Sequence, residues 1–235
     1  MQGNGSNRPA ADVQSLYPFL YADKSNVDDL IEQVRRSTVD KAREIIELRA
    51  QVLERDGERL VECATLMAAR FARGGRLLAF GNGGSSTDAQ ELVSLFLSPG
   101  PGTRPLPAFG LTNDIAVITA LCNDIGFDVV FSRQIAAFGR STDVAVGLST
   151  SGNSTNLLRA FDEAGRRGLF TVGIAGYDGG KMAELDSIDH LFVVPSPSVH
   201  RVQEAQTTIY HVLWELTLEA LDRAEVAAEA KGEPS

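Results

Sequence analysis

Short apolar runs alternate with amphipathic helical patterns through most of this chain of 235 residues. Strands are predicted over about residues 76–81, 108–112, 143–149, 169–176 and 190–196. Helices are predicted over about residues 85–97, 114–122, 154–167, 179–185 and 199–224. Strands that alternate with helices indicate an α/β fold with a doubly wound, mainly parallel sheet flanked by helices. The strand runs are almost continuously apolar, as expected where helices cover both faces of a sheet.

The region before the first strand is predicted to hold a flexible arm over residues 1–24 and helices over residues 25–73. Gly57 predicts a break between two helices, because glycine costs about 1 kcal/mol relative to alanine inside a helix. So long a helical extension is expected either to pack against a partner subunit or to fold back on its own domain. The main domain is then residues 74–224, and the tail over residues 225–235 is expected to fray.

Charge and composition exclude several classes of function. The formal net charge is −9 and no stretch is rich in lysine or arginine, so direct binding of nucleic acid is not expected. No apolar run reaches the roughly 18 to 20 residues that span a bilayer, and the N-terminus lacks the pattern of a signal peptide. Cys63 and Cys122 lie in apolar helical surroundings and are interpreted as reduced, which predicts a cytoplasmic protein.

Two turns rich in small polar residues connect predicted strands to predicted helices. They read GNGGSS over residues 81–86 and LSTSGNST over residues 148–155. A helix start at the carboxyl end of a parallel strand offers unpaired N–H groups and a partial positive charge to an anion. The residues that can hold a phosphate are Asn82, Gly83, Gly84, Ser85, Ser149, Thr150, Ser151 and Ser154. Taken singly, each turn is equally compatible with a simple helix cap or turn; two such turns in one sheet favour a phosphate site.

Five motifs, in order along the chain, give it a specific resemblance to a known family. They read GNGGSSTDAQ, ALCNDIGFDVVFSRQ, LSTSGNST, GYDGGKMAEL and RVQEAQTTIYHVLWEL. Over about residues 40–222 the chain resembles the sugar isomerase (SIS) domain family, and within it the phosphoheptose isomerases. The resemblance implies the SIS fold, a sugar-phosphate ligand, interconversion of sedoheptulose 7-phosphate with a heptose 7-phosphate, and assembly into a homotetramer.

The same resemblance assigns site residues. The substrate contacts of the family fall on Asn82, Gly83, Gly84, Asn123, Asp124, Ser149, Thr150, Ser151, Ser154 and Gln203. The zinc site of the family uses a histidine and a glutamate on the helix after the first turn, then a glutamine and a histidine on the last helix. Gln203 and His211 match the last two, whereas Glu91 stands at the histidine position and Leu95 at the glutamate position.

The departure at Leu95 matters because that glutamate is both a metal ligand and the catalytic base in the family. Glu91 lies four residues earlier, on the same helix face and about 6 Å away, so a carboxylate is retained one turn displaced. We therefore expect Glu91 to act as base and His211 as acid, with Glu91, Gln203 and His211 as candidate zinc ligands. His211 is also compatible with a core histidine, and His200 with either a further ligand or a surface residue.

Two functions stay open from these residues. The first is an aldose–ketose isomerase that acts on sedoheptulose 7-phosphate or a similar sugar phosphate, with an altered metal and base site. The second is a non-catalytic SIS module that binds a phosphosugar or a protein partner, as a bacterial factor that binds the replication initiator does. His211 beside Gln203 favours the isomerase and Leu95 favours the binding module; we prefer the isomerase.

Overall fold

The computed structural model describes residues 27–231 of the chain. The arm predicted over residues 1–24 lies outside these residues, as do residues 232–235 of the predicted tail. None of the helices within the described range is long and apolar enough to cross a membrane.

The chain divides into two units, the first ending at Glu44 and the second beginning at Ile45. Helix α2 (Val27–Phe71) supplies the described part of the first unit and also begins the second. In the first unit the helix surface is exposed and carries ion pairs one turn apart, such as Arg36 Nε to Glu32 Oε1 at 2.9 Å. The unit boundary therefore falls inside α2, within the helical region predicted over residues 25–73.

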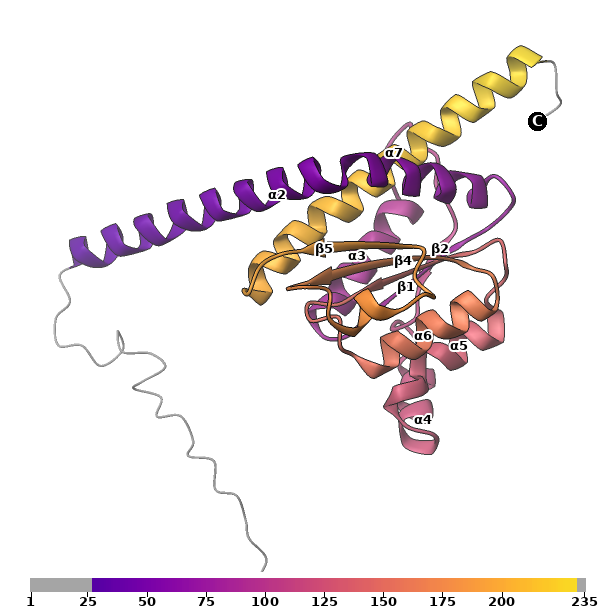
Figure 1. Ribbon diagram of the computed structural model, residues 1–235, viewed down its shortest axis with the longest axis horizontal. Helices are drawn as coiled ribbons and strands as arrows, with labels where there is room; N and C mark the ends of the chain where they lie inside the picture. Colours follow the sequence, from indigo (N-terminus) through magenta and orange to yellow (C-terminus); the bar gives the residue numbers. More distant parts are fainter. Residues whose placement is uncertain (1–26, 232–235) are drawn as a thin grey trace, which may run out of the picture. The chain divides into compact units, whose positions relative to one another are not determined.

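A five-stranded sheet with the strand order β2-β1-β3-β4-β5 forms the centre of the second unit (Figure 1). Its strands are β1 (Leu77–Gly81), β2 (Ala108–Gly110), β3 (Val144–Leu148), β4 (Phe170–Gly176) and β5 (His190–Val194). All neighbouring strands pair in parallel, with Leu77 opposite both Ala108 and Val144, and Val172 opposite His190. The predicted α/β fold with a doubly wound parallel sheet is confirmed.

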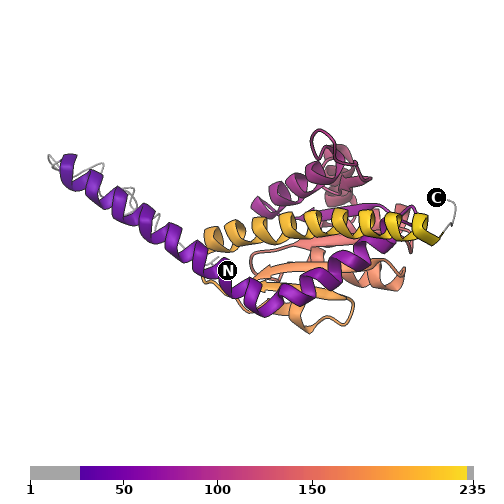
Figure 2. The ribbon, with the colours of Figure 1, turned by 90° about the horizontal axis from the view of Figure 1, so that it is seen from above.

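Helices cover both faces of this sheet, and α7 runs beside the second-unit part of α2 (Figure 2). The elements are α3 (Gly84–Leu97), α4 (Ile115–Asp124), η2 (Phe127–Val129), α5 (Val130–Phe138), α6 (Thr155–Arg166), η3 (Gly180–Glu184) and α7 (Val199–Lys231). One buried cluster joins α2, α3 and α7 to strand residues such as Leu77 and Val146. The other joins α5 and α6 to the alternate strand residues, such as Leu78 and Ala145. Successive strand residues point to opposite faces, so each helix layer buries its own half of the strand side chains.

Gly147 in β3 lets aromatic rings pack directly against the sheet. A Cβ atom at Gly147 would lie 2.5 Å from the Phe161 ring and 2.7 Å from the Phe80 ring. The Phe80 centroid lies 5.5 Å from that of Phe131 and 5.3 Å from that of Phe161. These ring contacts pack β1 against α5 and α6, and so stabilise the strand ends to which the polar turns are attached.

Helix α2 runs through Gly57 without the break that the sequence predicts. The residues around Gly57 are anchored by tertiary contacts, because Leu60 is buried and the carboxylate of Asp56 accepts hydrogen bonds from Arg55 and Arg59, each at 2.6 Å. These contacts outweigh the propensity cost of about 1 kcal/mol for one glycine.

Helix α7 also differs from its prediction, because it continues to Lys231 instead of ending near residue 224. Its last turns are rich in alanine and glutamate, which are strong helix formers. Arg104 forms an ion pair with Glu225 at the start of this extension. The part of the predicted tail that the structure describes is therefore helical.

Candidate active site

The two polar turns lie at the ends of neighbouring strands. In the strand order, β2 lies beyond β1, whereas β4 and β5 lie beyond β3, so the direction of winding changes between β1 and β3. The crevice at such a switch point is the usual ligand site of an open α/β sheet. A reciprocal amide pair joins the two turns: each of Asn82 and Asn156 donates through Nδ2 to Oδ1 of the other at 2.9 Å. The fold thus brings both halves of the predicted phosphate site together.

The turn after β3 is shaped by its own hydroxyl groups. Ser149 Oγ accepts a hydrogen bond from the Gly152 N–H at 3.0 Å, and Ser151 Oγ accepts one from the Asn153 N–H at 3.3 Å. Ser154 occupies the N-cap position of α6, yet its side chain makes no capping hydrogen bond. Ser154 therefore does not act as a simple helix cap, because its hydroxyl accepts no hydrogen bond from the N–H groups at the start of α6.

The turn after β1 depends on two glycines. Gly83 has φ 56° and ψ −123°, a conformation that side chains disfavour, and it precedes the first residue of α3. A Cβ atom at Gly84 would lie 2.4 Å from Gln203 Nε2, so only glycine lets Gln203 approach so closely. Gln203 Nε2 also donates to Asp88 Oδ2 at 3.1 Å. Burial raises the pKa of Asp88, and the hydrogen bond from Gln203 opposes this shift.

Gln206 supports the turn after β3 (Ser149–Ser154, hereafter the phosphate turn), a role that no sequence motif indicated. Its side chain is fully buried, and its Nε2 donates to the carbonyls of Ser149 at 2.9 Å and Ile174 at 3.2 Å. These bonds tie α7 to the carboxyl ends of β3 and β4. The sequence held little signal for this role, because Gln206 is followed by Thr207 and Thr208 and so does not stand out as a polar residue.

Glu91, Tyr210 and His211 meet between α3 and α7. The Tyr210 hydroxyl donates to Glu91 Oε2 at 2.7 Å, and His211 Nε2 lies 3.4 Å from Glu91 Oε1. Tyr210 is fully buried, and its ring lies 5.3 Å from the His211 ring, nearly parallel to it at 27°. Burial raises the pKa of Tyr210, so its hydroxyl remains a neutral donor at neutral pH. The structure thus pairs the predicted base and acid, and adds Tyr210, which no motif had indicated.

No contact recorded among the described residues joins Gln203 to the other two candidate metal ligands, Glu91 and His211. Glu91 and His211 are neighbours, but the Gln203 amide is bonded to Asp88, about one helical turn before Glu91 on α3. Across residues 27–231, no group of three or more histidine, cysteine, aspartate or glutamate side chains could hold a metal ion. Leu95 packs against the buried cluster of α2, α3 and α7, and so continues the core.

Asn123 and Asp124 lie at the end of α4, and their side chains are exposed. Asn123 Nδ2 donates to Asp124 Oδ1 at 2.8 Å, and the structure records no contact between this pair and the polar turns. His200 is exposed at the start of α7, as expected for a surface residue. Within a single chain, therefore, no recorded contact brings the predicted substrate residues Asn123 and Asp124 to the polar turns.

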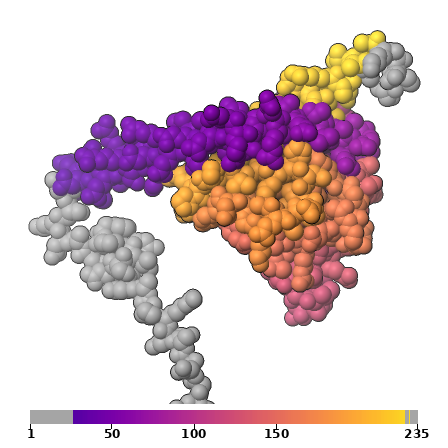
Figure 3. Space-filling model, viewed as in Figure 1, coloured from indigo at the N-terminus to yellow at the C-terminus, as the bar shows by residue number. Residues whose placement is uncertain are grey.

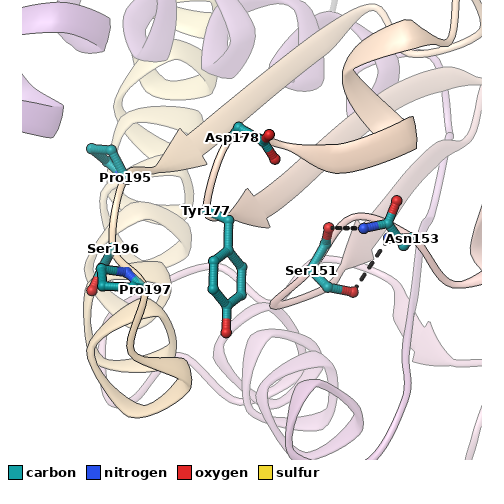
Figure 4. A pocket seen from close by; sticks show the side chains of 7 residues that line it. All are labelled: Ser151, Asn153, Tyr177, Asp178, Pro195, Ser196 and Pro197. Carbon is teal, nitrogen blue, oxygen red and sulfur yellow. Dashed lines mark hydrogen bonds between the residues drawn. The ribbon is translucent and has the colours of Figure 1, made fainter.

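A cavity of about 620 Å³ opens beside the phosphate turn. Its lining comes from the turns after β3, β4 and β5, and consists of Ser151, Asn153, Tyr177, Asp178, Pro195, Ser196 and Pro197 (Figure 4). In Figure 4 the Tyr177 ring stands between Ser151 and the segment of Ser196 and Pro197. The cavity thus extends the phosphate turn along the carboxyl edge of the sheet.

Known proteins share this fold and these sequence features. A model of the SIS domain matches residues 42–176. The phosphoheptose isomerase of Nitratidesulfovibrio vulgaris is 43% identical over 189 residues, which cover 80% of this chain and 90% of that protein. The phosphoheptose isomerase of Aquifex aeolicus is 41% identical over 181 residues, covering 75% of this chain and 92% of that protein.

A solved structure agrees with these relatives. The structure of phosphoheptose isomerase from Neisseria gonorrhoeae is 36% identical, with a TM-score of 0.71, and the match covers 80% of this chain and 98% of that one. The chain belongs to the SIS domain family and, within it, to the phosphoheptose isomerases.

Proposed function

We propose that this chain is an aldose–ketose isomerase that acts on sedoheptulose 7-phosphate or a closely similar sugar phosphate. The observation that carries the proposal is the contact of Glu91 with Tyr210 and His211. It brings a carboxylate and an imidazole together between α3 and α7, although Leu95 replaces the glutamate of the family. The membership of the chain among the phosphoheptose isomerases supports the same reaction.

The reaction moves one proton between adjacent carbons. Glu91 removes the proton from C1 of the ketose while His211 protonates the carbonyl oxygen at C2, and an enediol forms. Glu91 then returns its proton to C2, and His211 takes the proton from the oxygen at C1, which becomes the aldehyde. The hydroxyls and N–H groups of Ser149–Ser154 hold the phosphate and so fix the sugar chain against this pair.

Zinc is a separate part of the proposal. A zinc ion bound in the site would polarise the substrate carbonyl. Glu91 Oε1 and His211 Nε2 offer one oxygen and one nitrogen, but Glu91 Oε2 accepts from Tyr210 and the Gln203 amide donates to Asp88. The residues present therefore fit the ion only in part, and the proton transfers above are assigned to Glu91 and His211 alone.

We further propose a homo-oligomer, with a tetramer as the expected state. Apolar side chains on the second-unit part of α2 are exposed: Ile46, Leu53, Val61 and Leu66. This part of α2 lies at the molecular surface (Figure 3). Light scattering is expected to give about four times the chain mass of 25.2 kDa, and a mass near 25.2 kDa would contradict the proposal.

The free cysteines Cys63 and Cys122 support a reducing location such as the cytoplasm.

Turnover of sedoheptulose 7-phosphate by the purified chain, with and without added zinc, tests the function. Glu91→Gln keeps the shape of the side chain and removes the base, so turnover should fall by about 10²- to 10⁴-fold while phosphate binding is retained. If the wild type binds the sugar phosphate in calorimetry but does not turn it over, and Leu95→Glu creates turnover, the chain is a binding module. If Glu91→Gln turns over like the wild type, Glu91 is not the base.

A further inference from the structure

The turn after β4 contains a strained backbone position. Tyr177 has φ 54° and is the only non-glycine residue with a positive φ between residues 27 and 231. The Gly179 N–H donates to the Gly176 carbonyl at 2.9 Å, so Tyr177 is the second residue of a tight turn. Turns with a positive φ at this position strongly favour glycine. A bulky aromatic residue there is an outlier of the kind that clusters at functional sites.

The tyrosine ring is not part of the buried core. Tyr177 is 38% exposed and belongs to neither of the two buried clusters. Its phenol makes no hydrogen bond or ring contact with the residues that the structure describes. The turn is held instead by main-chain bonds and by Asp178, whose Oδ1 accepts from the Gly180 N–H at 3.0 Å. The exposed part of the ring is therefore free to contact a ligand.

The strained turn is locked onto the phosphate turn. A Cβ atom at Gly152 would lie 1.9 Å from the Gly179 carbonyl oxygen, and one at Gly180 would lie 2.3 Å from the Ser151 carbonyl oxygen. The Met182 N–H donates to the Gly152 carbonyl at 3.0 Å. Because the two turns touch backbone to backbone, the position of Tyr177 is fixed relative to Ser151.

The ring also forms one wall of the cavity of about 620 Å³ beside Ser151 (Figure 4). Opposite it stand Ser196 and the prolines Pro195 and Pro197. A ligand whose phosphate sits at Ser151 can place the carbons next to that phosphate against this wall. Apolar and aromatic walls with a few polar groups are typical of small-molecule sites.

We propose that Tyr177 is a substrate-contacting residue whose ring packs against the carbon chain of a bound sugar phosphate, next to the phosphate held at Ser151. This inference rests on the proposed sugar-phosphate ligand. The strained turn holds the ring in place before the ligand arrives, so little ordering is needed on binding. The contact adds affinity for the sugar portion of the ligand and leaves the phosphate contacts themselves unchanged.

Calorimetric titration of the full chain with sedoheptulose 7-phosphate and with inorganic phosphate tests the proposal. Tyr177→Gly removes the ring and suits the positive φ, and Tyr177→Asn is a second variant because asparagine tolerates this conformation. Tyr177→Phe is the matched control, since it keeps the ring and loses only the hydroxyl. We expect the Gly and Asn variants to bind the sugar phosphate at least about tenfold more weakly, and the Phe variant to stay within about twofold of the wild type.

The comparison of the two ligands separates a contact from a distortion. Inorganic phosphate should bind the Gly and Asn variants within about twofold of the wild type, because the phosphate turn is unchanged. Equal weakening for both ligands, or unchanged binding of sedoheptulose 7-phosphate, would overturn the proposal. The titration needs no turnover, so a wild type that binds but does not isomerise would refute the proposed reaction and still test the contact at Tyr177.

Discussion

Replacing Tyr210 with phenylalanine tests whether the carboxylate of the site depends on a neighbour that no sequence motif contains. The change removes one hydroxyl, which donates to Glu91 Oε2 at 2.7 Å and lies 3.3 Å from Thr207 Oγ1. A hydrogen bond to a charged group contributes about 1.5–3 kcal/mol. The Glu91 side chain is 51% exposed, so water replaces part of the lost bond. We therefore expect the free energy of unfolding to fall by only about 1 kcal/mol.

The expected effect on catalysis is separate from this loss of stability. Without the hydroxyl, Glu91 is no longer held in one orientation against His211, so kcat should fall by about tenfold with KM near the wild-type value. Steady-state kinetics with sedoheptulose 7-phosphate and thermal melting are measured on the same samples. Thr207→Val is the matched control, because it removes the 3.3 Å contact of Tyr210 and keeps the bond from Tyr210 to Glu91.

Two results would refute this reasoning. If Tyr210→Phe melts about 2–4 °C lower but turns over like the wild type, the hydroxyl stabilises the fold and does not position Glu91. If KM rises by about tenfold while kcat is unchanged, Tyr210 acts through substrate binding and not through the base.

Three further predictions concern the pH dependence of stability and the packing of two glycines. Burial lowers the pKa of His190, whose Nδ1 has no partner among the residues described, so the unfolded chain takes up a proton that the folded chain resists below about pH 6.5. The wild type should therefore lose stability relative to His190→Phe as the pH falls from 7 to 5 (about one proton of difference), and parallel melting temperatures would contradict this. Gly147→Ala should cost about 1–3 kcal/mol in urea unfolding, because its Cβ would lie 2.5 Å from the Phe161 ring. Gly57→Ala, with its nearest contact at 3.4 Å, should instead stabilise α2 by about 1 kcal/mol, and equal effects of the two substitutions would count against the packing argument.

The strands and helices of the second unit could be predicted because local patterns in a single sequence indicate them. Five apolar runs separated by helical patterns correspond to β1–β5, because strands buried on both faces need apolar side chains at every position. The continuity of α2 through Gly57 did not follow, since it depends on Asp56 meeting Arg55 and Arg59 and on the burial of Leu60. Helix propensity is a weak term beside such contacts.

The site was predictable where it consists of local turns and not where it depends on helix packing. Both polar turns were identified because glycines, serines and a strand–turn–helix pattern occur within a few residues. Asn156 and Gln206 were missed, since each acts through a partner in a distant segment: Asn82 for the first, and the carbonyls at the ends of β3 and β4 for the second. Tertiary structure determines such partners, and local sequence patterns do not indicate which distant segments meet.

Glu91 and Leu95, which differ from the family pattern, must be considered together with the residues that contact them. Leu95 alone suggests that a catalytic carboxylate has been lost, and its packing against the core supports that interpretation. Tyr210 changes the argument, because a buried phenol is costly unless its hydroxyl is satisfied, and the partner that satisfies it is Glu91, 119 positions away in the sequence. The other oxygen of the same carboxylate lies 3.4 Å from His211 Nε2, which is the partner that the proposed proton transfer needs. The pairing therefore supports the proposed role of Glu91 as the base, one turn before Leu95 on α3.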